Sequence, residues 1–214
     1  MIKNNFTQSH EDPCLFIHQK IHLIVAIFVD DCTIIGTPNQ VKIFKKFMTD
    51  RFEMRDLGKI DYLLGIKIDY SNDHISLNQS SYIQSILERF QMTEVKPMYT
   101  PFDKWLILEG ESVNQKLYQQ AVGSLMFLQT ATRLDLSFAV NQMARFMHDP
   151  RESHWKAVLR IFRYLKHTQD LELTYKKDSE SKLIGYANAS FANNVTNRKS
   201  TSGYTFITNG GAVS

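Results

Sequence analysis

The sequence has few of the residues that build disulfide frameworks or membrane spans. Its 214 residues include only two cysteines, Cys14 and Cys32, which stand far apart and lack metal-ligand spacing. They predict reduced thiols rather than a disulfide-linked fold. The longest apolar run, 23–29, is far too short to cross a bilayer, and the polar leader lacks the apolar region of a signal peptide. We therefore expect an intracellular protein, cytoplasmic or nuclear, with no membrane partner.

Signatures of other chemistries are also scarce. The nine glycines form no phosphate-binding loop, no Gly-x-Ser-x-Gly elbow is present, and the seven histidines are interpreted as predicting no zinc site. The formal net charge is only +3, which gives modest attraction to nucleic acid and no strong global field. With 43% hydrophobic residues, the chain can bury a sizeable core in one large or two small domains.

What the sequence does contain is an acidic pair at the end of an apolar run. Residues 24–29 read Ile-Val-Ala-Ile-Phe-Val, Asp30 and Asp31 follow at once, and a second apolar run comes next. This pattern predicts a β-hairpin that carries both carboxylates at its tip. Oxygen ligands of this kind suit Mg²⁺ in phosphoryl chemistry. The alternative is an ordinary turn, because Asp tolerates turn geometry well.

A series of further segments occurs in the order found in copia-type retrotransposon polymerases. They resemble the Tyr/Phe-x-Asp-Asp signature, the primer-grip segment, the helical region beyond the palm and the early ribonuclease H segment. In this sequence they span 28–31, 57–66, 118–125, 132–140, 154–157 and 198–204. The chain is therefore identified as similar to the Pol polyproteins of copia-type LTR retrotransposons, from the C-terminal part of the reverse transcriptase into the start of ribonuclease H.

The resemblance implies an α+β fold in three parts. Residues 1–96 would form a partial reverse-transcriptase palm, with a hairpin, a small sheet and the primer grip. Residues 97–176 would form a helical thumb- or connection-like region, and residues 177–214 a truncated ribonuclease H-like hairpin. The boundary is placed at the proline-containing stretch 96–101, which breaks regular structure.

The resemblance also assigns the polymerase site. Asp30 and Asp31 would be catalytic residues and Mg²⁺ ligands, with Asp30 the better placed, and Leu64 and Gly65 would belong to the primer grip. Because neighbouring residues on a strand point to opposite faces, the pair alone is a poor two-metal centre. In the family the third carboxylate and the fingers lie upstream of residues 5–9, so we expect no polymerisation by this chain alone.

The ribonuclease H segment departs from the family pattern. Asn188 stands where the family has its first metal-binding Asp, while Ser190 and Asn194 replace two further acids. An amide offers a neutral oxygen but no charge to hold Mg²⁺. Since the chain also stops before the remaining acidic positions, we expect no ribonuclease activity.

One predicted helix, 154–167, carries a basic face. Lys156, Arg160, Arg163 and His167 follow spacings of four, three and four residues, which aligns them on one side, with apolar residues opposite. Such a stripe can contact a phosphate backbone without reading sequence. The alternative is an ordinary solvated helix face.

Hydrophobic periodicity predicts the remaining elements. We expect a helix after residues 36–39 that extends to Phe52, paired strands at 62–70 and 74–78, and a helix around 82–90. Beyond these, helices are expected at 114–130, 135–147 and 154–167, and a strand at 171–175.

Three functional hypotheses follow. The first is a polyprotein fragment that acts on a primer–template or an RNA/DNA hybrid in the family but makes no DNA alone. The second is a non-catalytic nucleic-acid-binding remnant that uses the face from Lys156 to His167. The third is a half-polymerase that Asp30 completes when an upstream polypeptide segment supplies the missing palm and fingers. Open sheet edges would also favour self-association.

Overall fold

The computed structural model describes residues 5–103, 110–177, 182–191 and 199–213. Its helices and antiparallel sheets confirm the predicted α+β class. Contacts within the chain divide it into two compact units, residues 1–59 and 60–214. The predicted domain boundaries after residues 96 and 176 stay a prediction. Asn194 and Arg198 lie outside the described residues.

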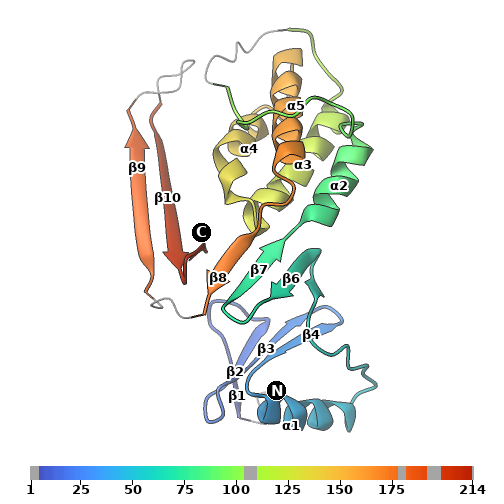
Figure 1. The fold of residues 1–214 in the computed structure, drawn as a ribbon, viewed down its shortest axis with the longest axis vertical. Helices are drawn as coiled ribbons and strands as arrows, with labels where there is room; N and C mark the ends of the chain where they lie inside the picture. The colour runs from blue at the N-terminus through green and yellow to red at the C-terminus, as the bar shows by residue number, and fades with distance from the viewer. Residues whose placement is uncertain (1–4, 104–109, 178–181, 192–198, 214) are drawn as a thin grey trace. The chain divides into compact units, whose positions relative to one another are not determined.

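The first unit contains a four-stranded antiparallel meander. Its strands are β1 (Phe6–Gln8), β2 (Leu15–His18), β3 (Leu23–Phe28) and β4 (Asp31–Ile35), in that spatial order. β3 pairs with β2 and with β4, so the most apolar strand takes an inner position (Figure 1). The alternate residues Leu23 and Val25 are fully buried, which identifies the core face of this sheet.

Helix α1 (Pro38–Thr49) covers that core face. It begins with a capping box in which the backbone N–H of Thr37 donates to Oε1 of Gln40 at 2.9 Å. Phe44 is buried against Leu23 and Val25. Phe52 lies beyond the helix and is exposed, so the helix is shorter than the periodicity predicted.

The second unit joins a sheet to a group of helices. β5 (Tyr62–Leu63), β6 (Ile66–Tyr70), β7 (His74–Asn78) and β8 (Leu173–Lys176) form an antiparallel sheet in this order. β8 follows the last helix yet pairs with β7, with Leu77 opposite Leu173. Strands from both sides of the stretch 96–101 therefore share one sheet.

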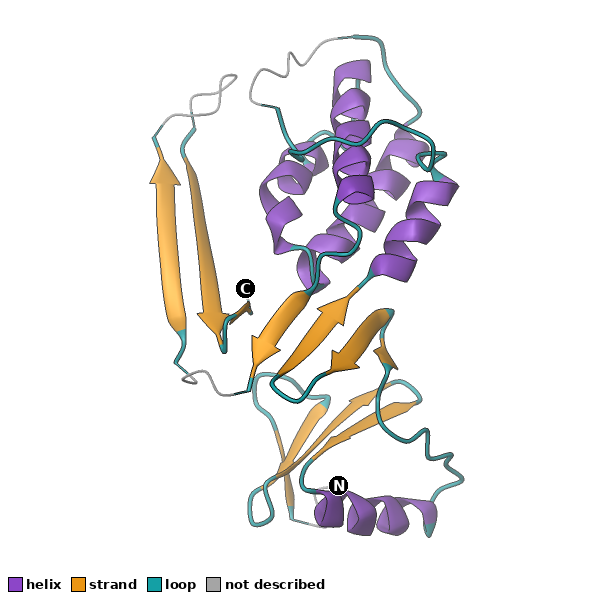
Figure 2. Ribbon diagram, in the orientation of Figure 1, coloured by secondary structure: helices purple, strands orange, loops and turns teal. Residues whose placement is uncertain are grey.

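The helices of this unit surround a single apolar core. They are α2 (Ser80–Arg89), α3 (Gln115–Ala131), α4 (Ser137–Ala144) and α5 (Glu152–His167), with a short 3₁₀ turn, η2 (Leu134–Leu136), before α4 (Figure 2). Fully buried residues come from each α-helix, among them Ile83, Leu125, Val140 and Phe162. None of the described helices combines the length and the apolar character needed to span a membrane.

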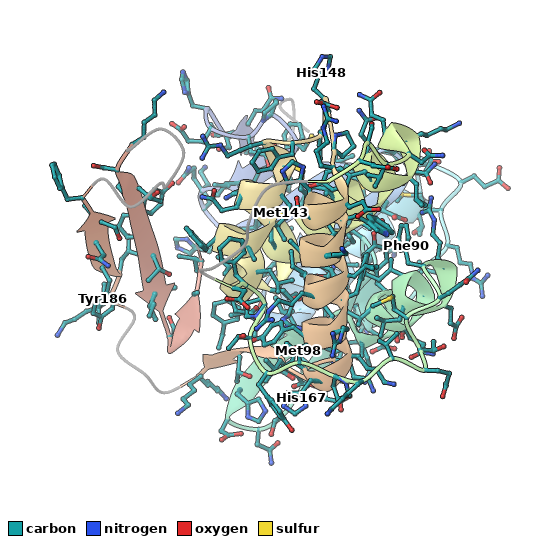
Figure 3. All side chains as sticks on the ribbon, turned by 90° about the horizontal axis from the view of Figure 1, so that it is seen from above. Phe90, Met98, Met143, His148, His167 and Tyr186 are labelled. Carbon is teal, nitrogen blue, oxygen red and sulfur yellow. The ribbon has the colours of Figure 1, made fainter. Side chains whose placement is uncertain are left out.

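A second sheet of this unit has the order β11-β10-β9, from β9 (Ile184–Ser190), β10 (Thr201–Thr208) and β11 (Gly211–Ala212). Its lower end is tied to β8, because the Tyr175 hydroxyl donates to the Ala212 carbonyl at 2.6 Å and the Lys176 N–H donates to the Asn209 carbonyl at 2.7 Å. Most of β9 is exposed, and Figure 3 shows Tyr186 on this ribbon, well apart from the helices.

A buried arginine joins the end of α3 to the end of α5. Arg133 is only 1% exposed. Its guanidinium makes two bonds to the Asp135 carboxylate, at 3.0 and 2.8 Å, and donates to both the carbonyl and the hydroxyl of Thr168, the residue that caps α5. The Tyr164 hydroxyl donates to the same carboxylate at 2.9 Å. Each of the three guanidinium nitrogens thus has at least one hydrogen-bond acceptor, as a buried guanidinium requires.

Replacing Arg133 should destabilise the second unit strongly. Arg133→Ala removes the donors of Asp135 and Thr168 and leaves a cavity, so we expect the free energy of unfolding to fall by about 3 kcal/mol. Urea unfolding followed by tryptophan fluorescence measures this, since both tryptophans belong to the second unit. Arg145→Ala, at an exposed arginine, is the control and should change stability by less than about 0.5 kcal/mol. Equal effects of the two changes would contradict the role given to Arg133.

Candidate functional site

The acidic pair lies at the tip of the predicted hairpin. β3 and β4 are antiparallel, with Phe28 opposite Asp31, so Val29 and Asp30 form the two-residue turn between them. Both aspartates are exposed. Cys32, the next residue of β4, packs toward the core on the α1 side. Because neighbouring residues of a strand point to opposite faces, the Asp31 side chain lies on the sheet face away from α1. The structure thus brings two adjacent carboxylates to one exposed turn.

The backbone of this turn is strained. Val29 has φ +52°, a region that β-branched residues rarely occupy, and its side chain is 81% exposed. Glycine is the usual residue where a two-residue hairpin turn needs positive φ. Strain of this kind persists where the surrounding structure imposes it, and it is concentrated at functional sites. Val29 shares this positive φ with five other non-glycine residues of the described chain, among them Leu64 in the β5–β6 turn.

Asp30 and Asp31 fit part of the ligand set of a magnesium ion. Their carboxylates are hard oxygen donors, they face solvent, and Mg²⁺ is commonly held by one or two carboxylates plus substrate phosphates. Within the parts of the chain that the structure describes, no group of three or more His, Cys, Asp or Glu side chains is positioned to hold a metal.

One histidine spacing was overlooked in interpreting the sequence. His18 and His22 are four residues apart, a spacing that suits a zinc site only on a helix. Here His18 ends β2 and packs edge-on against Phe6, with ring centroids 5.0 Å apart, while His22 lies in the following turn with φ +48°. Because the pair spans a strand end and a turn, the helical geometry of that motif does not arise.

The predicted primer-grip residues form a second tight turn. Leu64 and Gly65 connect β5 to β6 with φ of +51° and +80°. Positive φ at both central residues is what a two-residue type I′ hairpin turn requires. A Cβ on Gly65 would lie 3.8 Å from the ring of Phe127 on α3, and that ring meets Tyr82 of α2 edge-on at 5.0 Å. Tyr82 begins the helix predicted around 82–90, whereas no sequence pattern singled out Phe127. Together the two rings place the hairpin tip beside α2 and α3.

The predicted basic face of α5 holds another segment of the same chain. Residues 93–103, here called the strap, cross α5 as the green trace in Figure 1. Arg163 Nε donates to the Lys96 carbonyl at 2.6 Å, and Arg160 donates to the carbonyl and hydroxyl of Thr100 at 3.2 and 2.7 Å. Arg160 also pairs with Asp103 at 3.4 Å. The face is therefore not the ordinary solvated one that the alternative interpretation assumed.

Further contacts of the strap extend along the C-terminal half of α5. The Met98 N–H donates to the Arg163 carbonyl at 3.2 Å, and Tyr99 meets His167 edge-on with centroids 4.6 Å apart. Figure 3, seen from above, shows Met98 and His167 near one another beside the helix. Lys166, to which the sequence analysis gave no role, donates to the carbonyls of Thr93 and Val95.

Lys156 is the member of the predicted basic face that stays outside the strap contacts. Its ammonium group lies 3.7 Å from the Glu152 carboxylate one turn earlier, and its side chain is largely exposed. The face thus divides into side chains that hold the strap and one that faces solvent. Nucleic-acid binding by this face stays a prediction.

Asn188 lies in the middle of β9, opposite Gly203 of β10, and is exposed. Ser190 follows on the same side of the strand, two residues further along. The ring of Phe206 covers the neighbouring Gly185, where an added Cβ would come within 2.8 Å of it. The amide of Asn188 is thus presented on a paired strand rather than in a loop.

Comparisons with known proteins show which family the sequence matches. Residues 1–104 match the family described as reverse transcriptase (RNA-dependent DNA polymerase). That match covers the Asp30–Asp31 hairpin and the turn at Leu64 and Gly65, and it defines the class of protein. The chain belongs to the copia-type reverse transcriptases of retrotransposon Pol polyproteins.

The relatives extend the similarity beyond residue 104. The chain is 34% identical over its whole length to the retrovirus-related Pol polyprotein from transposon TNT 1-94 of Nicotiana tabacum, covering 17% of that protein. It is 34% identical to that from transposon RE1 of Arabidopsis thaliana, with 93% of this chain and 14% of the polyprotein covered. The chain thus spans about a sixth of these polyproteins or less.

A shorter relative matches over most of its own length. An uncharacterized mitochondrial protein of Arabidopsis thaliana is 30% identical over 190 residues, which cover 86% of this chain and 79% of that protein. No solved structure matches the chain.

Relieving the strain at Val29 should stabilise the first unit. Val29→Gly removes the positive-φ penalty, and after the entropic cost of glycine we expect a gain of about 1 kcal/mol. Native-state hydrogen exchange of the β3 amides measures it. Val29→Ala removes the exposed isopropyl group but keeps Cβ and hence most of the positive-φ penalty. It should therefore stabilise the first unit much less than Val29→Gly does. If the two variants were equally stable, backbone strain would not be the cause.

Arg163 should hold the strap more firmly than Lys156 does. Arg163→Ala removes the charged donor of the Lys96 carbonyl, so we expect the Met98 amide, which bonds to α5 in the strap, to exchange about tenfold faster. Hydrogen exchange resolved at Met98 tests this. Lys156→Ala, on the same helix face, should leave that rate unchanged. An unchanged rate in Arg163→Ala would show that the strap is held by other contacts.

Proposed function

We propose that this chain is part of a retrotransposon reverse transcriptase in which Asp30 and Asp31 supply some of the Mg²⁺ ligands for DNA synthesis on a primer–template. The observation that supports this most directly is the β3–β4 turn, where backbone strain at Val29 accompanies two exposed carboxylates. When bound, Mg²⁺ stabilises the charge that develops on the transferred phosphoryl group. The activity of a whole polyprotein is part of this proposal, because the chain spans only a fraction of its relatives.

The proposal assigns a role to each region. The first sheet with α1 is the partial palm, and the turn at Leu64 and Gly65 is the primer grip. Helices α3 to α5 form the thumb- or connection-like region. β9 to β11 form the ribonuclease H-like start. The tip of the β5–β6 turn lies beside the aromatic pair Tyr82 and Phe127, which gives this turn a rigid support of the kind that positioning a primer end demands.

We also propose that these two aspartates do not complete a polymerase site by themselves. Two-metal catalysis places its ions roughly 3.5–4 Å apart and shares several anionic oxygens between them. Asp30 lies within the turn and Asp31 is the first residue of β4, so this turn supplies only two carboxylates. Catalysis then takes further carboxylates from another segment of the polyprotein, as the half-polymerase hypothesis requires.

The ribonuclease H-like region carries a parallel proposal. Asn188 presents a neutral amide where the family pattern has a metal-binding carboxylate. Mg²⁺ is poorly held by such a ligand in the absence of charge. We therefore expect this region to contribute structure rather than RNA cleavage.

Metal binding at the turn can be tested with Mn²⁺ as a paramagnetic probe. We expect Mn²⁺ to broaden the amide resonances of residues 29–31 selectively, and Asp30→Asn to abolish most of that broadening, because the carboxylate charge is lost. Asp50→Asn, at an exposed acid of the same unit, is the matched control and should preserve it. Uniform broadening over all exposed acids would contradict a site at the turn.

Primer extension on a poly(rA)–oligo(dT) substrate then tests whether the site is complete. We expect no Mg²⁺-dependent incorporation by the purified chain. Incorporation by this chain alone, abolished in Asp30→Asn, would disprove the proposed incompleteness while supporting the metal-binding role.

A further inference from the structure

A shallow depression lies between α5 and the segment that follows α2. It has a volume of about 410 Å³ and is lined by Met92, Val95, Lys96, Lys156, Leu159, Arg160 and Arg163. All of these residues belong to the second unit. The four from α5 follow helical spacings of three and four residues, so they form one continuous wall, and the start of the strap forms the other.

The floor and the rim of this depression differ in chemistry. We call the apolar lining residues, Met92, Val95 and Leu159, the floor, and the four cationic ones, Lys96, Lys156, Arg160 and Arg163, the rim. Met92 has a flexible, polarizable side chain that adapts to the shape of its neighbours. The lining of the depression includes no aromatic side chain and no acidic one.

The rim retains positive charge although two of its arginines are engaged. Arg163 donates to a neutral main-chain carbonyl, which satisfies a donor without cancelling the charge. The charge of Arg160 is compensated in part by the Asp103 carboxylate, 3.4 Å from the guanidinium. The charge of Lys156 is compensated in part by the Glu152 carboxylate, 3.7 Å from the ammonium group. A guanidinium has five N–H donors, so both arginines keep further donors beyond the strap contacts.

This combination disfavours a nucleic acid as the occupant. A duplex places its phosphates on a convex rod, which could contact the rim but would leave the aliphatic floor uncovered. A single strand gains most from bases stacked on aromatic side chains, and the lining offers none. An amphipathic peptide satisfies both parts, because aliphatic side chains fill the floor while flanking carboxylates meet the cations.

We propose that the depression between α5 and the start of the strap is a docking site for an acidic amphipathic peptide segment of a protein partner, with one or two leucine-like side chains on Met92, Val95 and Leu159 and carboxylates on the cationic rim. This role is independent of the metal-binding turn at Asp30 and Asp31.

The test uses a fluorescein-labelled 14-residue peptide with leucines at helical spacing and glutamates between them. Fluorescence anisotropy should show saturable binding that weakens as salt is raised, because two of the rim cations, Lys96 and Lys156, are exposed. The same peptide with its leucines replaced by serine should bind at least about tenfold more weakly, since the floor then has no apolar side chain to cover.

Variants of the protein locate the site. Leu159→Ser and Lys156→Gln should each weaken peptide binding several-fold, while Lys116→Gln, at an exposed lysine on α3 outside the depression, should not. The Met98 amide exchange rate reports whether the strap remains in place in each variant. Asp30→Asn should leave peptide binding unchanged, so failure here is distinguishable from failure of the proposed metal site.

Three results would overturn the proposal. Equal binding of the leucine and serine peptides would show that only charge matters. Tighter binding of a 15-nucleotide single strand, lost in Lys156→Gln, would make this face a phosphate contact. Loss of peptide binding on concentrating the protein, with a matching increase in its mass, would show that a second copy occupies the site.

Discussion

The second unit depends on one buried charge. Arg133 lies between the end of α3 and the start of η2. Its guanidinium donates to Asp135 in η2 and to Thr168, which caps α5. A buried guanidinium is tolerated only when its donors are satisfied. The carboxylate of Asp135 and the carbonyl of Thr168 must therefore stay in place together. Because β8 follows Thr168 closely in the chain, this constraint also fixes the start of the strand that closes the β5–β8 sheet.

Helix α5 uses its two sides for different structural contacts. Its apolar side supplies Val158, Ile161 and Phe162 to the core. Its basic side donates to main-chain carbonyls of the strap, which runs outside the helices and sheets and so lacks their internal hydrogen bonds. A row of long cationic side chains suits that task, because each can reach a different carbonyl without requiring a regular backbone. Positive charge on a helix is thus a weak indicator of nucleic-acid binding when an irregular segment lies within reach.

The hairpin of the first unit presents the opposite situation. There both acids are exposed, and the turn that carries them has a positive φ at Val29. An uncharged Asn-Gly turn would connect the same strands with less strain. The family that matches residues 1–104 is described as reverse transcriptase (RNA-dependent DNA polymerase), and the role proposed for the turn rests on that match.

Local patterns in the sequence determined the elements and the family. Alternation predicted the β3–β4 and β6–β7 hairpins, helical spacing predicted α2, α3 and α5, and the ordered motifs predicted the reverse transcriptase resemblance; each is confirmed. These predictions succeed because periodicity and turn chemistry act over a few residues. Only the tertiary structure decided that β8 pairs with β7, that Arg133 is buried and that the basic face of α5 holds residues 93–103. Those outcomes depend on groups separated by tens of residues, and which carbonyl satisfies which cation is settled only when the chain has folded.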